Sequence, residues 1–452
     1  MSAALPSHIP SVDSSSYPVR SGNALRALVD GEAAFGRICE AVEAAKKSVW
    51  LTIAFHHAPF RMPGGRGSLF DVLDNATARG IDVRVIFWRS HRALGEHFHG
   101  TQDDHAWLDG RGSKFLARWD RAQKDYCQHQ KSWLVDAGEP SEIAFVGGIN
   151  LNPASVCAAG HADRDGDHTH DVYLEIRGPS ATDVHHNFVQ RWNEASERGV
   201  PLGTRIGGGS DLPFPHAASP EAGRSIVQMQ RTVRAGHYSD GTATPGGVSL
   251  PIGDGEFSIF DQYCKAIDAA KSTIYIEDQY LVSPDVAERL QAALARGVDV
   301  VFLCPAEPED QVMEAMRSPA AAPLRAQLAA LGDHPNFLLA GIASPRTNEA
   351  IYIHDKIMLV DDCWATIGSC NIASRSFFGD TELNAAIWDE DFVRALRVEL
   401  LQEHLGIDTS RMEARDALAL YREAARGNAQ ARHRGEPMRG LAFALDPASY
   451  AT

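Results

Sequence analysis

The chain has 452 residues, of which 44% are hydrophobic and 23% charged, so it is large enough for two or three globular domains with full cores. No apolar run reaches the roughly 18 residues of a membrane-spanning helix, and residues 1–20 lack the basic-then-apolar order of a Sec-type signal peptide. The net charge of −16 argues against a nucleic-acid partner and against electrostatic adsorption to anionic membranes. We therefore expect a cytoplasmic protein by default, although a non-Sec export route would leave no trace in the sequence.

The first half of the chain alternates helical and strand patterns. Helical spacing predicts helices at residues 35–47, 69–79 and 181–196, and short β-rich runs predict strands at residues 48–55, 83–88, 131–136, 143–146 and 171–176. Alternation of this kind favours an α/β fold with helices on both faces of a sheet.

A Gly- and Pro-rich stretch at residues 203–224 predicts a linker, which gives an N-terminal domain of residues 1–210 and a C-terminal domain of residues 211–452. The second half then repeats the order of the first. Helices are predicted at residues 260–271, 286–296 and 392–404, and strands at residues 274–280, 300–304, 337–340, 356–360, 364–367 and 383–388. The tail, residues 412–452, is predicted to be helical to about residue 426 and irregular beyond it.

The two halves also resemble each other in sequence. Residues 45–51 are echoed by residues 270–276 at an offset of 225, and residues 147–150 by residues 368–371 at an offset of 221. A repeat of this length indicates two whole domains, because solenoid repeats have periods of only about 20–50 residues.

One repeated pattern carries chemistry, His-x-Lys-x-x-x-x-Asp. It occurs at His129, Lys131 and Asp136 and again, 225 residues later, at His354, Lys356 and Asp361. In a strand, residues i and i+2 face the same side, so each half would present an imidazole beside an ammonium group. Two facing halves would gather two His and two Lys around one anionic, tetrahedral ligand, for which phosphate is the obvious candidate.

This residue set suits transfer at phosphorus. A neutral imidazole would attack to give a phosphohistidine, and the second, protonated imidazole would give its proton to the leaving alkoxide and later deprotonate the attacking water or alcohol. Positive charge and amide donors would hold the phosphate oxygens, which assigns phosphate binding to Lys131, Asn150, Lys356 and Asn371. The lysines already neutralise the charge, so we expect no metal and no other cofactor.

Each catalytic His needs an acceptor for its second ring nitrogen, which fixes its tautomer and orientation. Asp171 and Glu382 are the candidates, because each opens a predicted strand downstream of one motif. The small residues after each motif, Gly147, Gly148, Gly368 and Ser369, either shape the site with their backbone amides or form only tight turns.

The duplicated motif resembles the defining signature of the phospholipase D superfamily, and the resemblance covers about residues 25–435. Residues 352–361 and 367–376, followed by Glu382, are especially similar. The run at residues 274–280 is similar to the eukaryotic-like, lipid-hydrolysing branch, so Gln279 and Tyr280 join the residues expected to shape the site.

The resemblance implies two pseudo-symmetric α/β/α sandwich lobes with the active site at their interface. It implies His129 as the nucleophile and His354 as the general acid. Asp136 and Asp361 belong to the catalytic motif, but the resemblance implies that they mainly serve structure through local charge pairing. Cys370 departs from the family pattern, where a small apolar residue is usual, and we expect no lipid-targeting domain before the catalytic part.

Together these features predict a monomeric phospholipase D that hydrolyses a glycerophospholipid, at a membrane or micelle surface, to phosphatidic acid and the head-group alcohol. An alcohol could replace water and exchange the head group. The nearest alternative is a transferase similar to a cardiolipin or phosphatidylserine synthase, which would share every catalytic residue. A nuclease of the same superfamily comes third, and a non-catalytic scaffold or toxin-like effector is the alternative from another class.

Three remaining features have plainer interpretations. The run from Asp163 to His170 lacks the Gly and the final Glu of an EF-hand loop, so a solvated acidic loop is favoured over a metal site. Aromatic residues near the motifs could cage a quaternary ammonium group, but core packing explains each of them as well. The seven cysteines are odd in number and scattered, which favours free buried thiols.

Overall fold

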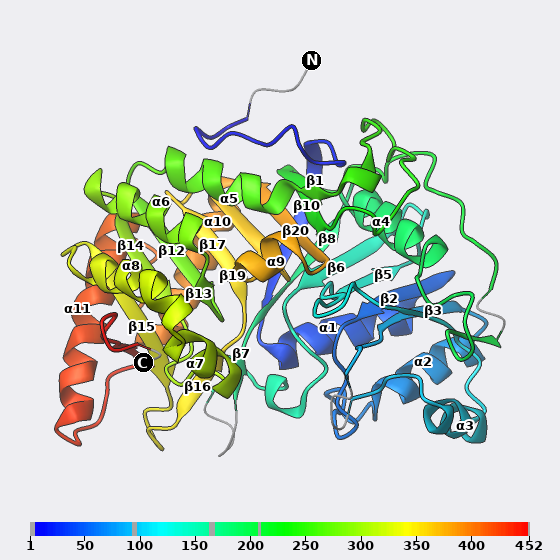
Figure 1. Ribbon diagram of the computed structural model, residues 1–452, viewed down its shortest axis with the longest axis horizontal. Coiled ribbons are helices and arrows are strands. Elements are labelled where there is room, and N and C mark those ends of the chain that lie inside the picture. Colours follow the sequence, from blue (N-terminus) through cyan, green and yellow to red (C-terminus); the bar gives the residue numbers. More distant parts are fainter. Residues whose placement is uncertain (1–4, 93–96, 162–167, 207–208, 451–452) are drawn as a thin grey trace.

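The computed structural model of this chain describes residues 5–92, 97–161, 168–206 and 209–450. Helices cover both faces of a large mixed β-sheet, with the N-terminal half on the right of Figure 1 and the C-terminal half on the left. The α/β class predicted from the alternation of helices and strands is confirmed.

The helices that the described residues form are α1 Gly31–Ala44, α2 Leu69–Ala78, α3 Gln102–Arg111, α4 Ala181–Asn193, α5 Ser258–Ala269, α6 Pro284–Ala295, α7 Asp310–Arg317, α8 Ala322–Gly332, α9 Ser374–Phe378, α10 Glu390–Leu405 and α11 Ala414–His433. The strands of the N-terminal half are β1 Arg20–Val29, β2 Ser48–Ile53, β3 Asp82–Trp88, β4 Leu116–Asp120, β5 Ser132–Val135, β6 Ile143–Gly147, β7 Thr169–His170, β8 Val172–Arg177 and β9 Thr204–Arg205. Those of the C-terminal half are β10 Ser225–Val233, β11 Glu256–Phe257, β12 Thr273–Asp278, β13 Leu281–Val282, β14 Asp299–Leu303, β15 Phe337–Ala343, β16 Ala350–Ile353, β17 Lys356–Val360, β18 Trp364–Gly368, β19 Ile372–Ala373, β20 Glu382–Trp388 and β21 Ala442–Ala444.

The strand pairings repeat in the two halves. In the first half the order across the sheet is β4-β3-β2-β5-β6-β8-β1, and in the second it is β15-β14-β12-β17-β18-β20-β10. Parallel and antiparallel pairs also correspond, since β2 is parallel to β3 and antiparallel to β5, as β12 is to β14 and β17. The sequence repeat is therefore a repeat of sheet topology.

Strands β1 and β10 join the two halves into one sheet. They pair antiparallel, with Arg20 opposite Val227 and Asn23 opposite Ser225. Each of them stands at the end of the strand order given above for its half. The same order of strands therefore extends away from the β1–β10 pair on both sides. The junction is therefore made of backbone hydrogen bonds as well as side-chain packing.

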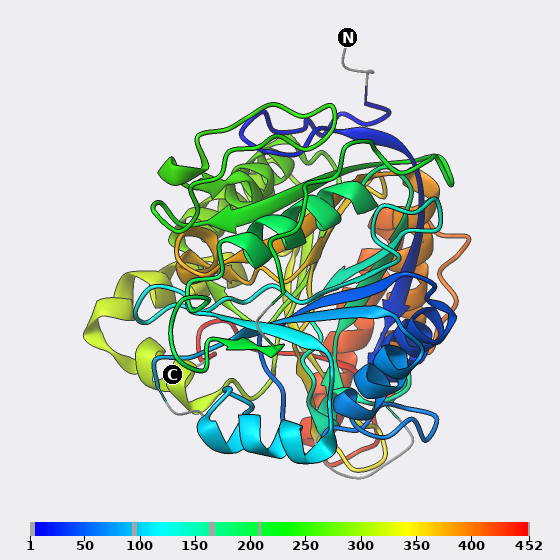
Figure 2. The same cartoon turned by 90° about the vertical axis from the view of Figure 1, so that its right-hand side faces the viewer.

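Three hydrophobic cores lie against this sheet. One lies between the first-half strands and helices α1 and α2, and a second lies between the second-half strands and helices α5 and α6. The third belongs to both halves, since it combines Phe188 and Trp192 of α4 with Leu400 of α10 and Tyr421 of α11. Figure 2 shows α1 and α2, in blue, on the opposite side of the first-half strands from α4. The shared core keeps the two halves in one fixed relation.

Several sequence-predicted elements differ from the structure. The tail predicted as irregular after residue 426 continues as helix to His433 and then adds β21, which pairs with β15. Strand β5 begins at Ser132, so His129 and Lys131 lie in the extended segment before it and not on a strand face. The predicted linker contains β9 and also residues 207–208, which lie outside the described residues.

Strands β1 and β10 were not predicted, because their polar side chains obscure the strand pattern. In β10, Gln228, Gln230 and Arg231 are buried. Their polar groups are paired: the Gln228 amide donates to Val12 O at 2.9 Å, and Arg231 forms an ion pair with the equally buried Glu256 at 2.8 Å. A buried strand that satisfies polar groups in this way shows no apolar alternation.

Two further properties concern membrane-spanning helices and the cysteines. In the part of the chain that the structure describes, none of the helices combines the length and the apolar character needed to cross a bilayer. All seven cysteines are free and buried, as expected from their number and spacing.

Candidate active site

The two motifs lie where the halves meet, and each is attached by its backbone to the opposite half. His129 donates its backbone N–H to Thr381 O at 3.0 Å, and His354 donates its own to His170 O at 2.9 Å. Strand β16, just before His354, pairs with β7 of the first half. Thr381 and His170 each directly precede a carboxylate residue, so the same attachment brings those carboxylates to the motifs.

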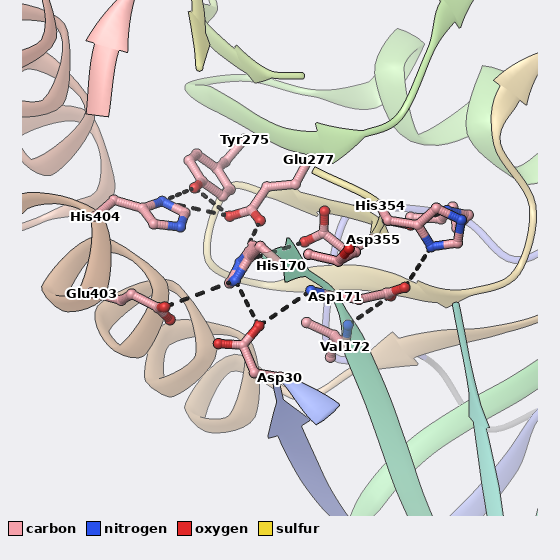
Figure 3. Close-up of polar contacts among 12 residues, drawn as sticks. Asp30, His170, Asp171, Val172, Tyr275, Glu277, His354, Asp355, Glu403 and His404 are labelled. Atoms are coloured by element: carbon pink, nitrogen blue, oxygen red, sulfur yellow. Dashed lines mark hydrogen bonds and ion pairs between the residues drawn. The ribbon is translucent and has the colours of Figure 1, made fainter. Parts of the chain in front are cut away.

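The carboxylates and imidazoles are paired crosswise. His129 Nδ1 lies 2.9 Å from Glu382 Oε1, and His354 Nδ1 lies 2.6 Å from Asp171 Oδ2 (Figure 3). Chain order singles out Asp171 and Glu382 as orienting residues, but it does not tell which His each of them contacts. In both pairs Nδ1 is occupied, which leaves Nε2 of each ring for chemistry.

The lysines lie beside these rings in a nearly closed site. Lys131 donates from Nζ to His129 O at 2.8 Å, and Lys356 makes the equivalent bond to His354 O. The exposed fractions are 8% for His129 and His354, 3% for Lys131 and 1% for Lys356. Bulk water therefore reaches the ring nitrogens through a small opening only.

Of the two asparagines assigned to phosphate binding, Asn371 is buried and Asn150 is half-buried. Asn150 Nδ2 lies 3.3 Å from His354 Nε2, so the first half contributes an amide to the second imidazole. Asn371 is 5% exposed, and neither Asn150 Oδ1 nor Asn371 Oδ1 has a hydrogen-bond partner among the described residues. Both side chains thus have unused polar atoms in the site.

The small residues near the motifs are small for steric reasons. A Cβ on Gly148 would lie 2.5 Å from Asp171 Oδ1, and one on Gly368 would lie 2.2 Å from Asn384 Oδ1. A Cβ on Gly147 would meet Val172 O at 2.3 Å. These glycines therefore let the strands approach closely enough to place the carboxylates.

Ser369 contributes its side chain. Its hydroxyl donates to Glu382 Oε2 at 2.6 Å and accepts Leu383 N–H at 3.1 Å. Both contacts fix the rotamer of Glu382, so Ser369 orients the residue that orients His129.

Gln279 and Tyr280 lie close to the second motif. The Gln279 amide donates to Tyr352 Oη at 2.8 Å, and Tyr280 Oη donates to Glu309 at 3.3 Å. Tyr352 is two residues before His354, so the Gln279 contact supports the segment that enters the second motif.

Phe55 is a site residue that the sequence analysis missed. Its ring centroid lies 6.1 Å from that of His129 and 5.9 Å from Lys131 Nζ. The offset of 225 makes Phe55 the counterpart of Tyr280, and that correspondence is the signal that would have found it.

The motif aspartates lie outside the site, which corrects their place among the catalytic residues. Asp136 and Asp361 follow β5 and β17, at the ends of these strands remote from the imidazoles. Asp136 accepts the backbone N–H groups of Lys46 and Lys47 at 2.9 and 2.7 Å, and Asp361 accepts those of residues 271–273 at 2.7–2.8 Å. Both therefore cap the turn before the neighbouring strand with backbone hydrogen bonds. The local charge pairing that the resemblance implies is secondary, with a single His8 contact to Asp361 at 3.0 Å.

The structure also bears on two further predictions, the solvated acidic loop and the aromatic cage. Residues 162–167 of the predicted acidic loop lie outside the described residues, but His168 and His170 are 5% and 0% exposed, so a solvated loop is wrong for these two. Trp133 and Phe377 belong to hydrophobic cores, which favours packing over a head-group cage for both.

Burial and the lysines keep both imidazoles neutral. Burial, with the Lys131 ammonium beside it, lowers the pKa of His129 well below its ordinary value. Burial and Lys356 lower the pKa of His354 to about 3. A bound phosphate would offset the lysine charges and raise the pKa of an imidazole that contacts it, so the ligand itself would prepare a general acid.

The carboxyl group of Glu382 and the ammonium group of Lys131 have pKa values close to each other. Burial raises the pKa of Glu382 to about 8 and lowers the pKa of Lys131 to about 8. Glu382 must be ionised to accept the proton on His129 Nδ1, and Lys131 must be charged to hold phosphate. Since Glu382 ionises and Lys131 discharges as the pH rises through the same region, the catalytic rate should form a narrow bell centred near pH 8.

Measuring kcat/KM across pH on phospholipid micelles checks this expectation. Lys131→Arg is the informative variant, because a guanidinium with a pKa above about 12 stays charged. This variant should keep its kcat/KM to higher pH than the native protein does. The decline of kcat/KM on the acid side should stay where it is. A rate that stays level between about pH 7 and about pH 9 in the native protein would contradict the assignment.

Comparisons with known proteins agree with this geometry. The family described as "Phospholipase D" matches residues 155–287, and the family described as "Cardiolipin synthase, PLD-like domain" matches residues 263–403. Cardiolipin synthase A of Pseudomonas putida (strain W619) is 27% identical over 385 residues, which cover 83% of this chain and 67% of that protein. Cardiolipin synthase of Listeria innocua is 24% identical over 387 residues, with 85% and 69% covered.

A solved structure shows the same fold. Phosphatidylserine synthase of Haemophilus influenzae Rd KW20 superposes with a TM-score of 0.56 at 13% sequence identity, over 90% of this chain and 94% of that one. At this identity the likeness concerns the fold alone.

Proposed function

Because the chain belongs to the phospholipase D superfamily, we propose that it is a phosphatidyltransferase, which moves a phosphatidyl group from a donor phospholipid to the hydroxyl of an acceptor alcohol. The observation that carries the proposal is the crosswise pair of His–carboxylate contacts, His129 with Glu382 and His354 with Asp171. This arrangement directs two imidazoles with defined tautomers at one buried place.

The prediction of phospholipase D hydrolysis as the main reaction is wrong. The curated relatives that match most of the chain are named cardiolipin synthase, and the protein of similar fold is a phosphatidylserine synthase. The sequence could not make this distinction, because hydrolysis and transfer use the same catalytic residues and differ in the acceptor. Lipid synthesis replaces lipid degradation as the proposed role.

The first half-reaction forms a covalent intermediate. Nε2 of His129 attacks the donor phosphorus while Glu382 holds the proton on Nδ1. The bond between phosphorus and the head-group oxygen breaks, and that oxygen takes the proton from Nε2 of His354. Lys131, Lys356 and the two site asparagines stabilise the charge that develops on the phosphate oxygens.

The second half-reaction transfers the group. His354, now neutral, takes the proton of the acceptor hydroxyl, whose oxygen attacks phosphorus and releases His129. A nearly closed site favours an alcohol over water, because the intermediate persists until an acceptor enters. In cardiolipin, two phosphatidyl groups share one glycerol, so phosphatidylglycerol is both the donor and the acceptor that we propose.

Product analysis tests the proposal. The protein is mixed with phosphatidylglycerol micelles, with phosphatidylglycerol plus ethanol, and with phosphatidylethanolamine plus serine. We expect cardiolipin in the first mixture and phosphatidylethanol in the second, each in excess over phosphatidic acid. Phosphatidylserine in the third mixture would identify the other synthase type. Phosphatidic acid as the main product in every mixture would refute transfer.

The location and assembly of the protein stay predictions. We propose that it works as a monomer at a membrane surface, on the cytoplasmic side, with a phospholipid as its partner. Flotation of the full chain with phosphatidylglycerol vesicles measures membrane contact directly.

A further inference from the structure

A second group of ionisable side chains lies behind the His354–Asp171 pair, and the proposed reaction does not use it. Figure 3 shows Asp30, His170, Glu277, Asp355, Glu403 and His404 close together. Asp30, His170 and Glu277 are 0% exposed, and His161, which lies in the same group, is 2% exposed. Such a concentration of buried carboxylates is costly unless a cation or protons offset it.

Four of these residues have the spacing of a tetrahedral metal site. His161 Nε2 lies 3.5 Å from Asp30 Oδ2, 3.4 Å from Glu403 Oε1 and 3.5 Å from His170 Nδ1. His170 Nδ1 lies 3.1 Å from Asp30 Oδ1 and 3.8 Å from Glu403 Oε1. In a tetrahedron with metal–ligand bonds of about 2.0–2.2 Å, the ligand atoms are about 3.3–3.6 Å apart. The separations scatter around that value, with Asp30 using Oδ2 toward His161 and Oδ1 toward His170, and one ligand atom from each of the four residues lies within 4.8 Å of the others.

The donor atoms are also available. Asp30 Oδ2 is buried and has no hydrogen-bond partner in the part of the chain that the structure describes, although it lies against His161 Nε2. Glu403 Oε2 is likewise buried without a hydrogen-bond partner among the described residues.

We propose that Asp30, His161, His170 and Glu403 bind one divalent transition-metal ion, and that this ion is Zn²⁺. Two imidazole nitrogens and two carboxylate oxygens at tetrahedral spacing are the donors and the geometry that Zn²⁺ prefers. We assign the ion no part in catalysis, because none of its four ligands acts in the proposed reaction. It is an addition to the site predicted from the motifs, for which no metal was expected.

The neighbouring residues form the outer shell that such a site needs. Nε2 of His170 lies 3.1 Å from Glu277 Oε2, so a carboxylate holds the ring nitrogen that faces away from the ion. The backbone N–H of Gly160 donates to Glu403 Oε1 at 2.7 Å and fixes that carboxylate. Asp30 and His161 have φ angles of 63° and 49°, conformations that residues with side chains adopt where the structure requires a particular placement.

The duplication offers an internal comparison. Val29 of β1 pairs with Val172 of β8, and at the equivalent place in the second half Arg231 of β10 pairs with Leu383 of β20. Asp30, which follows Val29, therefore corresponds to Thr232. His170, two residues before Val172, corresponds to Thr381. The second half therefore has neutral residues at the positions where the first half has two of the proposed ligands. The duplicated fold does not need charged groups there, which favours a specific role for them in the first half.

The position of the ion gives it a structural consequence. Asp30, His161 and His170 belong to the N-terminal half, whereas Glu403 lies in α10 of the C-terminal half. His170 also accepts the backbone N–H of His354 and directly precedes Asp171. A bound ion would therefore fasten the two halves together beside the segment that positions His354.

Metal binding by the full chain tests the proposal without any assay of activity. The protein is stripped with a chelator, dialysed and titrated with ZnSO₄, and bound metal is measured by mass spectrometry. We expect about one Zn²⁺ per chain and a higher Tm in its presence. Titration of the stripped protein with CoCl₂ should give the visible absorption of four-coordinate Co²⁺, a readout that needs no variant.

Glu403→Gln is the diagnostic variant, and Glu142→Gln is its matched control. Glu142 is also buried, lies 2.9 Å from His185 Nδ1 and accepts a glycine N–H, that of Gly138, at 2.9 Å. Glu403→Gln should lose Zn²⁺ binding and the Tm increase, whereas Glu142→Gln should keep both. The proposal is overturned if the stripped native protein takes up no Zn²⁺ and shows no Co²⁺ spectrum, or if Glu403→Gln binds Zn²⁺ like the native protein.

Discussion

Replacing His129 with Ala should lower phosphatidyl transfer by at least about 10⁴-fold, because no other group supplies the nucleophile that forms the covalent intermediate. Replacing His354 with Ala should cause a loss of similar size with a natural donor, since the head-group alkoxide then leaves without a proton. Equal losses would not show which residue is the nucleophile and which is the general acid. A donor with an activated leaving group makes this distinction.

A phosphatidyl donor that carries p-nitrophenol as its head group separates the two residues. Nitrophenolate is a stable anion and leaves without a general acid, so His354→Ala should release about one equivalent of it in a burst and stop at the phosphohistidine. His129→Ala should release none. Rapid mixing followed by absorbance measures the burst, and labelled lipid should leave acid-labile phosphate on His129. A burst from His129→Ala but none from His354→Ala would exchange the roles.

The residues of the site could be predicted from the sequence, but their partnerships could not. Periodicity and the repeat place His129, Asp171, His354 and Glu382 near the ends of β-strands. The crosswise contacts depend on how two distant halves dock, which neither half encodes locally. They follow from the β1–β10 junction and from the pairing of β7 with β16, and β1, β7, β10 and β16 were not predicted.

The functions of the motif aspartates show a related limit. Fixed spacing groups Asp136 with His129 in one pattern, and spacing alone suggests a common role. The short strand β5 between them carries Asp136 to the opposite end of the sheet, where it caps backbone N–H groups. A motif can therefore combine a chemical residue with one that fixes the strand holding it.

The buried cluster around His170 was missed for another reason. Its members come from five separate segments, and only His161 with His170, and Glu403 with His404, are near each other in sequence. No spacing pattern can indicate such a set. The acidic run at residues 163–170 favours a solvated loop over a calcium-type site, whereas the proposed ligands include the two imidazoles of His161 and His170.

Replacing the orienting carboxylates should lower transfer by about 10²–10⁴-fold, because each imidazole would lose control of its tautomer. The structure assigns Glu382 to His129 and Asp171 to His354, so Glu382→Gln should behave like a defect of the nucleophile and Asp171→Asn like a defect of the acid. Both substitutions keep the size of the side chain, and circular dichroism and Tm serve as controls for folding.

The nitrophenyl donor again makes the distinction. Asp171→Asn should recover most of the initial burst with this donor, since the step it impairs is bypassed, whereas Glu382→Gln should stay slow with both donors. If each carboxylate instead served the imidazole of its own half, Asp171→Asn would stay slow and Glu382→Gln would recover. The two arrangements predict opposite results in one measurement. Only the crosswise arrangement makes each catalytic group depend on residues from both halves, so that neither half alone would hold a complete nucleophile or a complete acid.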